Sequence, residues 1–418
     1  RKDECGYQRI CLNGDPIFQY GTLDQGWWPD GLLTPPSEEA MLWDMVQLKN
    51  MGFNTIRKHI KVEPEQYYYY ADSLGLMMWQ DMVSGFSTER KDEEHIKPNA
   101  QTDWNAPASH TNQWQQEMFE MIDRLRFYSC ITTWVIFNEG WGQHNTVEIV
   151  EKVMEYDKSR IIDGVTGWTD RGVGHMYYPS ASMILPACNG NRISVLGEFG
   201  GYGWAIKEHL WNPGMRNWGY KNIDGAMALM DNYGRLVYDL ETLIAQGLSA
   251  AIYTQTTDVE GEVNGLITYD RKVIKIPEGL LHIMHDRLYH VNPAKVITLV
   301  PDAQNGSAVS RAVSLNGQES KMTSLPFDCP PRSEIVSETS FDVNDEFSHL
   351  SLWVRATGDV KVWLNGVEVF SQEVKQTRQY NQYNISNYCR YLRKGKNELK
   401  IEVRETKKMS FDFGLRAY

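Results

Sequence analysis

The sequence is poor in cysteine, and the six cysteines that it has are scattered. They stand at positions 5, 11, 130, 188, 329 and 389 of 418 residues, without a Cys-x-x-Cys pair or a regular spacing. Zinc frameworks and dense disulfide scaffolds both depend on regularly spaced cysteines, so the sequence excludes both classes. Buried free thiols are the expected state, with one disulfide bridge left open as an alternative.

A long apolar run and an excess of basic residues are also absent. No stretch approaches the ~18 consecutive apolar residues of a membrane-spanning helix, so we expect no membrane span. The chain has 42 Lys and Arg against 54 Asp and Glu, which gives a net charge of −12. An acidic chain is a poor partner for nucleic acid or an anionic membrane surface, and we expect neither.

The sequence further lacks an initial methionine, an apolar leader and any metal-ligand spacing such as His-Glu-x-x-His. Because it begins Arg1-Lys2-Asp3-Glu4, we expect a processed, trimmed or partial chain. No catalytic metal and no cofactor are expected. The acidic residues 258–262 could hold a structural cation, although a solvated loop is the favoured interpretation.

Aromatic side chains are what the sequence has in abundance. It contains 14 Trp, 22 Tyr and 13 Phe, or 12% of the chain. Aromatic rings fill hydrophobic cores, and they also stack on the C–H faces of sugar rings. Composition alone therefore leaves two interpretations open, core packing and carbohydrate binding.

Residues 15–295 repeat one pattern, in which a short apolar or β-branched run ends in polar residues and a helical stretch follows. Eight runs are candidate strands: 17–23, 55–57, 76–79, 132–137, 161–165, 175–178, 193–196 and 250–254. The helical stretches are 38–50, 64–74, 113–127, 147–156, 226–246 and 277–287. This alternation predicts a closed (β/α)8 TIM barrel. The competing doubly wound sheet needs a Gly-rich phosphate turn, and no Gly-x-Gly-x-x-Gly follows Leu23.

The pattern changes after about residue 300. Residues 306–321 are polar and Ser-rich, and the Pro-Pro pair at 330–331 breaks any regular element. Short alternating runs follow at 350–354, 360–364, 368–370 and 399–403, separated by turn signals. This is typical of an antiparallel β-sandwich. We therefore expect an α/β chain of two domains, a TIM barrel over 1–298 and a small, jelly-roll-like β-sandwich over 299–418.

Two carboxylates stand out among the residues that end the expected barrel strands, where TIM-barrel active sites lie. Glu139 and Glu198 end the fourth and the seventh strand, where an unpaired buried carboxylate is costly. Hydrolysis of a glycosidic bond needs two opposed carboxyl groups, one to protonate the leaving oxygen and one to attack the anomeric carbon or activate water. Each Glu could instead be a salt-bridged strand-end residue, but that interpretation is weaker for both together.

The segments Asn138-Glu139-Gly140-Trp141 and Gly197-Glu198-Phe199-Gly200 resemble glycoside hydrolase family 2. This family of retaining (β/α)8 glycosidases includes β-galactosidases, β-glucuronidases and β-mannosidases. Residues 12–18, 52–57 and 72–76 are similar to the family as well, and the resemblance covers about 8–290.

The resemblance implies a role for each matching residue. Glu139 would be the general acid/base and Glu198 the nucleophile. Asn138 would hydrogen-bond the 2-hydroxyl of the sugar in the −1 subsite. Arg57 would support the nucleophile, and Asp81 would contact the sugar.

Further candidates for substrate binding are less closely matched. Tyr178 is the candidate for the tyrosine that hydrogen-bonds the nucleophile, with Tyr177 as the alternative. His59 follows Arg57 by two residues, whereas family members often place this His three residues after the Arg. Strand-end positions add three more candidates: Asp24, Trp141 and Trp204.

The reaction that the resemblance implies is double displacement with net retention. It predicts carboxyl groups ~5–5.5 Å apart, instead of the ~6.5–9.5 Å of inverting enzymes, and a raised pKa on Glu139. The leading hypothesis is a β-galactosidase-like hydrolase that cleaves terminal β-linked sugars from oligo- or polysaccharides. The alternatives are a β-glucuronidase or β-mannosidase, or a non-catalytic carbohydrate-binding protein. A uronate would need cationic or amide groups, for which Lys221 and Asn222 are candidates.

The chain departs from the family in its domain order. Family 2 members normally carry a jelly roll and an immunoglobulin-like sandwich before the barrel, and we expect both to be missing from this chain. The C-terminal sandwich resembles the sugar-binding-like jelly roll of such enzymes. The resemblance favours a periplasmic or secreted location and a carbohydrate substrate, and it leaves a homo-oligomer open.

Overall fold

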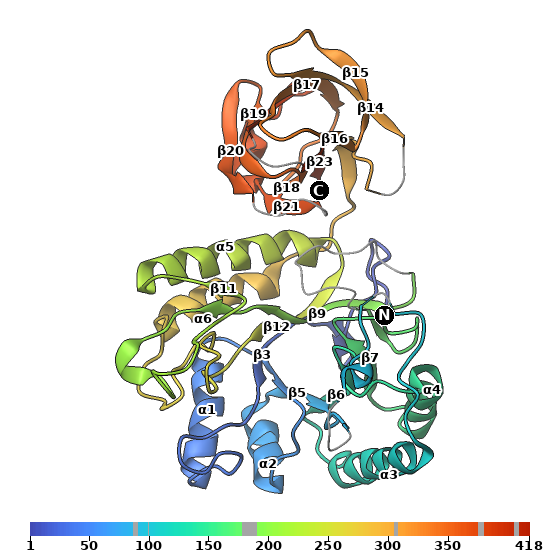
Figure 1. The fold of residues 1–418 in the computed structure, drawn as a ribbon, viewed down its shortest axis with the longest axis vertical. Helices are drawn as coiled ribbons and strands as arrows, with labels where there is room; N and C mark the ends of the chain where they lie inside the picture. Colours follow the sequence, from blue (N-terminus) through green and yellow to red (C-terminus); the bar gives the residue numbers. More distant parts are fainter. Residues whose placement is uncertain (87–90, 99, 178–189, 305–307, 375–379, 405–408) are drawn as a thin grey trace. The chain divides into compact units, whose positions relative to one another are not determined.

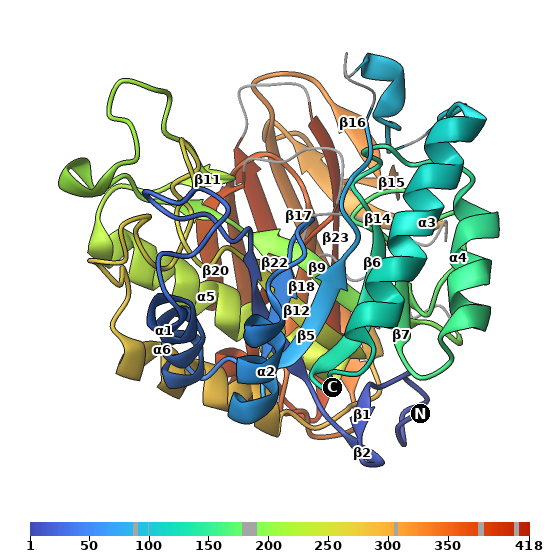
Figure 2. The ribbon, with the colours of Figure 1, turned by 90° about the horizontal axis from the view of Figure 1, so that it is seen from below.

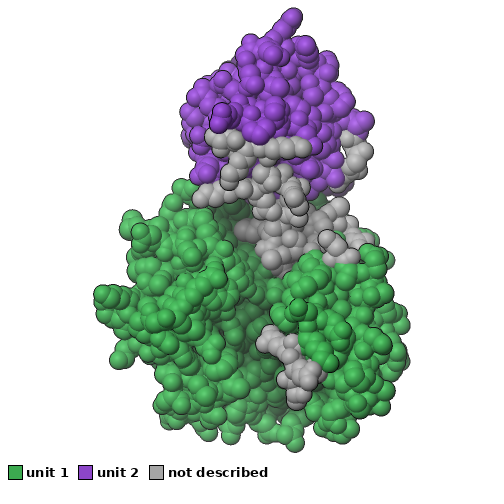
Figure 3. Space-filling model, viewed as in Figure 1, with its two compact units in different colours: residues 1–293 green, residues 294–418 purple. Residues whose placement is uncertain are grey.

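The computed structural model describes residues 1–86, 91–98, 100–177, 190–304, 308–374, 380–404 and 409–418. The chain forms two compact units, Arg1–Pro293 and Ala294–Tyr418, which are coloured separately in Figure 3. Each unit has a hydrophobic core of its own. No helix in these described ranges is long and apolar enough to cross a membrane.

Unit 1 is built on an eight-stranded parallel sheet in the order β7-β6-β5-β4-β3-β12-β9-β8. Its strands are β3 (Gln19–Asp24), β4 (Thr55–Lys58), β5 (Met77–Asp81), β6 (Ile131–Asn138), β7 (Ile161–Thr166), β8 (Met176–Tyr177), β9 (Ile193–Gly200) and β12 (Leu248–Thr254). The backbone N–H of His175, just before β8, donates to the carbonyl of Ile162 in β7 at 2.8 Å. The sheet therefore nearly closes on itself, which confirms the predicted TIM barrel.

Helices surround this sheet (Figures 1 and 2). They are α1 (Glu38–Asn50), α2 (Glu65–Leu74), α3 (Ala108–Leu125), α4 (Thr146–Tyr156), α5 (Ala226–Ala245) and α6 (Glu278–Asp286). In both views α3 and α4 lie side by side on one flank of the barrel, and α1 and α6 on the opposite flank. Helix α3 begins five residues before the predicted start, directly after Pro107, because proline needs no backbone donor at a helix start.

Short strands occupy the loops of unit 1. β1 (Cys11–Leu12) pairs with β2 (Asp15–Pro16) as a hairpin before the barrel. β10 (Tyr202–Gly203) pairs in parallel with β11 (Lys221–Asn222), inside the connection between β9 and α5. This second pair lies next to the carboxyl end of β9 and orders a loop of the site described below.

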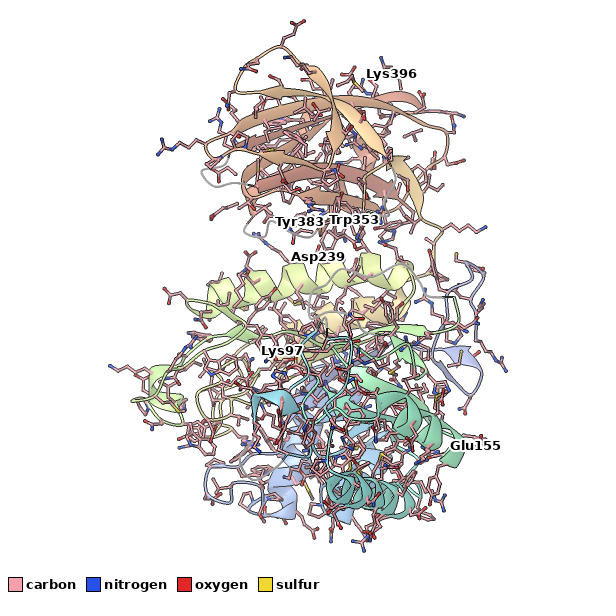
Figure 4. The ribbon with its side chains drawn as sticks, turned by 45° about the vertical axis from the view of Figure 1, so that its right-hand side comes forward. Lys97, Glu155, Asp239, Trp353, Tyr383 and Lys396 are labelled. Atoms are coloured by element: carbon pink, nitrogen blue, oxygen red, sulfur yellow. The ribbon has the colours of Figure 1, made fainter. Side chains whose placement is uncertain are left out.

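Unit 2 is a sandwich of two antiparallel sheets around a shared core, as predicted. One sheet contains β13 (Ile297–Val300), β23 (Met409–Ala417), β18 (Leu350–Arg355), β21 (Asn381–Asn384) and β16 (Phe327–Cys329). The other contains β15 (Lys321–Leu325), β14 (Val309–Leu315), β17 (Glu334–Val343), β22 (Gly395–Arg404), β19 (Gly358–Leu364) and β20 (Val367–Val374). Trp353 and Tyr383, labelled in Figure 4, lie on the paired strands β18 and β21.

The described part of the Ser-rich segment, residues 308–321, is more regular than its composition indicated. Its residues Val309 and Val313 are buried members of the core of unit 2, on strand β14. The intervening serine and arginine residues make the alternation of apolar and polar positions in β14 hard to recognise, because the apolar positions are few. Strand β17 likewise follows the Pro-Pro break without a strong apolar run.

Candidate active site

The centre of the site is a guanidinium group buried in the barrel. Arg57 in β4 has 0% exposure. Its Nε and Nη2 donate to Asp81 Oδ1 and Oδ2 at 3.0 and 2.9 Å, and Nη2 also donates to Asn138 Oδ1 at 2.8 Å. Its Nη1 donates to the carbonyl oxygen of Gly197 at 2.9 Å and to Glu198 Oε2 at 3.4 Å. One side chain thus joins the carboxyl ends of β4, β5, β6 and β9.

Arg57 and Asp81 hold each other in the charged form. Burial by itself lowers the pKa of Arg57, but Asp81 and Glu198 together outweigh it and the pKa is raised. Burial by itself raises the pKa of Asp81, but Arg57 and His59 together outweigh it and the pKa is lowered. His59 Nδ1 lies 3.0 Å from Asp81 Oδ2 and supplies a further partner. These three predicted site residues are therefore in direct contact.

Glu198 in β9 has a partner that the sequence did not identify. The hydroxyl of Tyr220 donates to Glu198 Oε1, and the backbone N–H of Tyr220 donates to the carbonyl oxygen of Gly201 at 2.8 Å. A Cβ on Gly201 would lie 2.4 Å from the Tyr220 ring, so a glycine with φ 62° is needed there. The sequence assigned this contact to Tyr178, which lies outside the described residues, or to Tyr177. The described tyrosine at Glu198 is Tyr220.

Glu139 follows β6 directly and has the left-handed φ of 48°. Its backbone N–H donates to the carbonyl of Thr166 in β7 at 3.0 Å. A Cβ on the next residue, Gly140, would lie 2.4 Å from the carbonyl oxygen of Ile96. A left-handed residue other than glycine costs about 1–3 kcal/mol, a cost that is frequent at functional sites. The tight turn therefore fixes Glu139 at the mouth of the barrel.

The Glu139 carboxyl titrates near neutral pH. Burial raises its pKa from 4.5 to about 7, and the neighbouring charge of Glu198 acts in the same direction. Arg57, a hydrogen bond from Trp168 and the charge of His59 act oppositely without cancelling the effect. A carboxyl that is half protonated at neutral pH can donate and take up a proton in one catalytic cycle.

Aromatic rings line the Glu139 side of the site. The His95 ring stacks on Trp141 with ring centroids 3.5 Å apart, and it lies 4.9 Å from the ring of Trp168. His95 Nε2 is 3.0 Å from the carbonyl oxygen of Glu139. Phe86 packs edge-on against Trp141 at 5.6 Å. Trp141, which the sequence predicted as a pocket residue, is therefore part of this wall.

A cluster of amides and one carboxylate stands after β3 and β12. Gln25 Nε2 donates to Gln255 Oε1 at 2.9 Å and to Glu262 Oε2 at 3.3 Å. Asn264 Nδ2 donates to Glu262 Oε1 at 2.9 Å. Burial raises the pKa of Glu262, and the charge of Glu198 raises it further. Glu262 thus lies within electrostatic range of Glu198, although no pattern in the sequence indicated a role for it in the site.

Asp24, a predicted substrate-binding residue, is occupied by the protein itself. Lys58 Nζ and the Tyr67 hydroxyl donate to Asp24 Oδ2 at 2.8 and 2.7 Å, and the backbone N–H of Gly26 donates to Oδ1 at 2.8 Å. Burial alone would raise the pKa of Asp24, but Lys58 and these hydrogen bonds bring it to about 2. Asp24 braces the barrel mouth, and a contact with substrate stays a prediction.

The loop 258–262 is largely packed, with Glu260 exposed, so the expectation of a solvated loop is wrong for most of it. Asp258 is buried, and its Oδ1 accepts a hydrogen bond from Lys275 Nζ at 2.7 Å because a buried carboxylate needs a partner. The same ammonium donates to the backbone carbonyl of Trp204 at 3.1 Å, and the Trp204 ring packs against the barrel core. Within the described ranges, no three His, Cys, Asp or Glu side chains are grouped to hold a metal ion.

The electrostatic coupling of the two carboxyls is testable by titration. In a Glu198→Gln variant the pKa of Glu139 should fall from about 7, because one of the two causes that raise it is removed. It should stay above 4.5, because burial remains. Carboxyl ¹³C NMR of the labelled protein measures the shift, with Glu260→Gln, an exposed carboxyl, as the control. An unchanged pKa in Glu198→Gln would show that the two groups are too far apart to act as a pair.

Part of the barrel is similar to known proteins. Residues 36–187 match the family model described as "Glycosyl hydrolases family 2, TIM barrel domain". A curated protein of Formosa agariphila, described as "Putative beta-glucuronidase", is 28% identical over 139 residues. That match covers 33% of this chain and 12% of the relative.

Solved structures share the fold at low identity. A β-galacturonidase from Eisenbergiella tayi bound to glycerol superposes with a TM-score of 0.51 at 16% identity, over 69% of this chain and 54% of that one. β-Glucuronidase 3 of Bacteroides uniformis gives 0.49 at 12% identity, over 96% of this chain and 61% of that one. The chain thus spans about three fifths or less of the length of these proteins. Over residues 36–187, this chain is therefore similar to the TIM-barrel domain of glycoside hydrolase family 2.

Proposed function

We propose that this protein is a retaining β-glycosidase that removes terminal β-linked sugars from oligo- or polysaccharides. Its main support is the unequal surroundings of two carboxyls at one barrel mouth. Glu198 is held by Arg57 and Tyr220, while burial and Glu198 raise the pKa of Glu139 to about 7. Unequal surroundings give two chemically identical groups different tasks.

In the first step Glu198 attacks the anomeric carbon of the sugar, and the bond from that carbon to the leaving oxygen breaks. The leaving oxygen keeps the bonding electron pair and receives the proton of Glu139, so that a neutral alcohol departs. In the second step Glu139, now a carboxylate, takes a proton from water, and the water oxygen displaces Glu198 from the anomeric carbon. Two displacements at one carbon restore the original configuration.

The neighbours of Glu198 would orient it and the sugar. Asn138 Oδ1 accepts from Arg57, so its NH₂ end is the donor that remains for the sugar 2-hydroxyl. Tyr220 and Arg57 each donate to a different oxygen of Glu198, which holds the carboxylate plane. Asp81 in turn holds Arg57, and His59 holds Asp81.

Two sugars are the leading candidates. A β-glucuronide is supported by the name of the Formosa agariphila relative, a match of 28% identity over one third of this chain. A neutral β-hexoside such as a β-galactoside is supported by the carboxylate of Glu262, which lies within electrostatic range of the nucleophile candidate.

The reaction class is testable with 4-nitrophenyl β-glycosides of galactose, glucose, mannose and glucuronic acid. We expect turnover of at least one of them, and a loss of ~10³-fold or more in kcat for Glu198→Ala. Glu139→Ala should keep more activity on nitrophenyl glycosides than on the matching disaccharide, because nitrophenolate leaves without a proton. Turnover that survives Glu198→Ala contradicts the nucleophile assignment, and no turnover at all favours a carbohydrate-binding protein.

Tyr220→Phe tests the contact that the sequence did not predict. Removing the hydroxyl takes one hydrogen bond from a charged group, worth about 1.5–3 kcal/mol. The kcat should therefore fall about 10- to 100-fold. The comparison variant is Tyr177→Phe, since the Tyr177 ring lies 5.3 Å from Arg192. A loss in Tyr177→Phe without a loss in Tyr220→Phe would reverse the assignment.

A further inference from the structure

We infer that Glu262 sets the sugar specificity of this site, by accepting hydrogen bonds from the hydroxyls of a neutral sugar and repelling the carboxylate of a uronic acid. The inference rests on the proposed function, because it assigns the substrate class of the same pocket. Glu262 belongs to the loop after β12, at the carboxyl end of the barrel where substrate must enter.

The loop of Glu262 is hydrogen-bonded to the segment that carries Tyr220. The backbone N–H of Trp218 donates to Gly261 at 2.8 Å, and the N–H of Val263 donates to the carbonyl of Trp218 at 2.8 Å. Tyr220, two residues further on, donates its hydroxyl to Glu198. Glu262 is therefore tied to the structural unit that contacts the nucleophile candidate.

The hydroxyl of Tyr220 lies among three carboxylates. Burial raises its pKa, and the charges of Glu198, Glu262 and Glu139 each raise it further. Tyr220 therefore lies within electrostatic range of all three carboxyl groups, and its segment is hydrogen-bonded both to Glu198 and to the loop of Glu262. An anionic substituent on a sugar bound at Glu198 would face a third negative group.

The hydrogen-bond partners of Glu262 are neutral amides, and the charge of His59 acts on its pKa from further away. Its two oxygens accept from the amides of Gln25 and Asn264, and no Lys or Arg in the described part of the chain lies within ion-pair distance. Asp258, four residues earlier in the same loop, is by contrast 2.7 Å from Lys275. A carboxylate has about four acceptor positions. Two amides therefore leave Glu262 both its charge and room to accept sugar hydroxyls.

The described cations near the mouth already have protein partners. Lys58 is bonded to Asp24 and Glu63. Lys221, a sequence candidate for binding a uronate, donates to Asn232 in α5 at 2.6 Å. These side chains stabilise the protein, and their hydrogen bonds and ion pairs are made with groups other than Glu262.

Lys97, labelled in Figure 4, is the rival cation. It is exposed, and its Nζ is 3.2 Å from His95 Nδ1, in the aromatic wall on the Glu139 side. A uronate-specific enzyme would use Lys97 to bind the sugar carboxylate. A neutral-sugar enzyme would use Glu262 to accept hydrogen bonds from sugar hydroxyls. The two possibilities predict opposite effects of Glu262→Gln and Lys97→Met on the preference between neutral and uronic sugars.

The experiment compares wild type, Glu262→Gln, Glu260→Gln and Lys97→Met on the four nitrophenyl β-glycosides named above. Glu262→Gln keeps the size of the side chain and one acceptor oxygen but removes the charge. Glu260 is the matched control, because it is exposed in the same loop. Activity is recorded as kcat and KM separately, and folding is checked by the thermal unfolding midpoint.

We expect wild type to favour its best neutral glycoside over the glucuronide by ~100-fold or more in kcat/KM. Glu262→Gln should reduce this preference at least ~10-fold, through slower turnover of the neutral sugar and faster turnover of the glucuronide. Glu260→Gln and Lys97→Met should leave the preference unchanged.

The failures are distinguishable. Three outcomes overturn the inference and leave the glycosidase proposal intact. Wild type could prefer the glucuronide, Lys97→Met could lose glucuronide turnover, or Glu262→Gln could lower all rates by one factor. Turnover that is absent from every substrate, or that persists in Glu198→Ala, overturns the proposed function and the inference with it.

Discussion

The guanidinium of Arg57 is buried in the barrel and requires counter-charges and hydrogen-bond acceptors nearby. This requirement determines the arrangement of the site. Arg57 has no exposed surface, and an uncompensated charge at such a position costs several kcal/mol. Asp81 neutralises it through two hydrogen bonds, while Nη2 also donates to Asn138 and Nη1 donates to Glu198. The same constraint that keeps the protein folded therefore fixes the amide and the carboxylate of neighbouring strands. Loss of Asp81 would disturb both.

The second carboxyl, Glu139, differs from Glu198 in its hydrogen-bond partners. Glu139 has no guanidinium bonded to it in the described contacts, and it sits in a left-handed turn where burial and Glu198 favour the protonated form. Glu198 Oε2 lies 3.4 Å from Arg57 Nη1, and Glu198 Oε1 accepts a hydrogen bond from the Tyr220 hydroxyl. The two carboxyls thus have different surroundings, which supports the proposed division into acid and nucleophile, and Glu262 adds a third carboxyl within electrostatic range of Glu198.

Strand-end residues were predictable because the β/α alternation is strong and parallel strands bring their carboxyl ends to one face of a barrel. Arg57, Asp81, Asn138, Glu139 and Glu198 all follow from that rule. Tyr220 did not, because it stands in a long irregular connection after β9, where no periodicity relates it to Glu198. The glycine pair at 200–201 was the available signal, since it marks a close approach of another side chain. Glu262 was not predicted for a related reason. Acidic residues in a loop are expected to be exposed to solvent, and the sequence does not show that this loop pairs with Trp218.

The central claim is that Glu139 and Glu198 act together in a double displacement. The configuration of the sugar at the moment of its release tests it most directly. Proton NMR of the reaction with the best β-glycoside resolves the two anomers before they interconvert in water. The account predicts that the β-anomer appears first and the α-anomer accumulates only later by mutarotation. An α-anomer released first would mean a single displacement by water, and would contradict the assignment of Glu198 as the nucleophile.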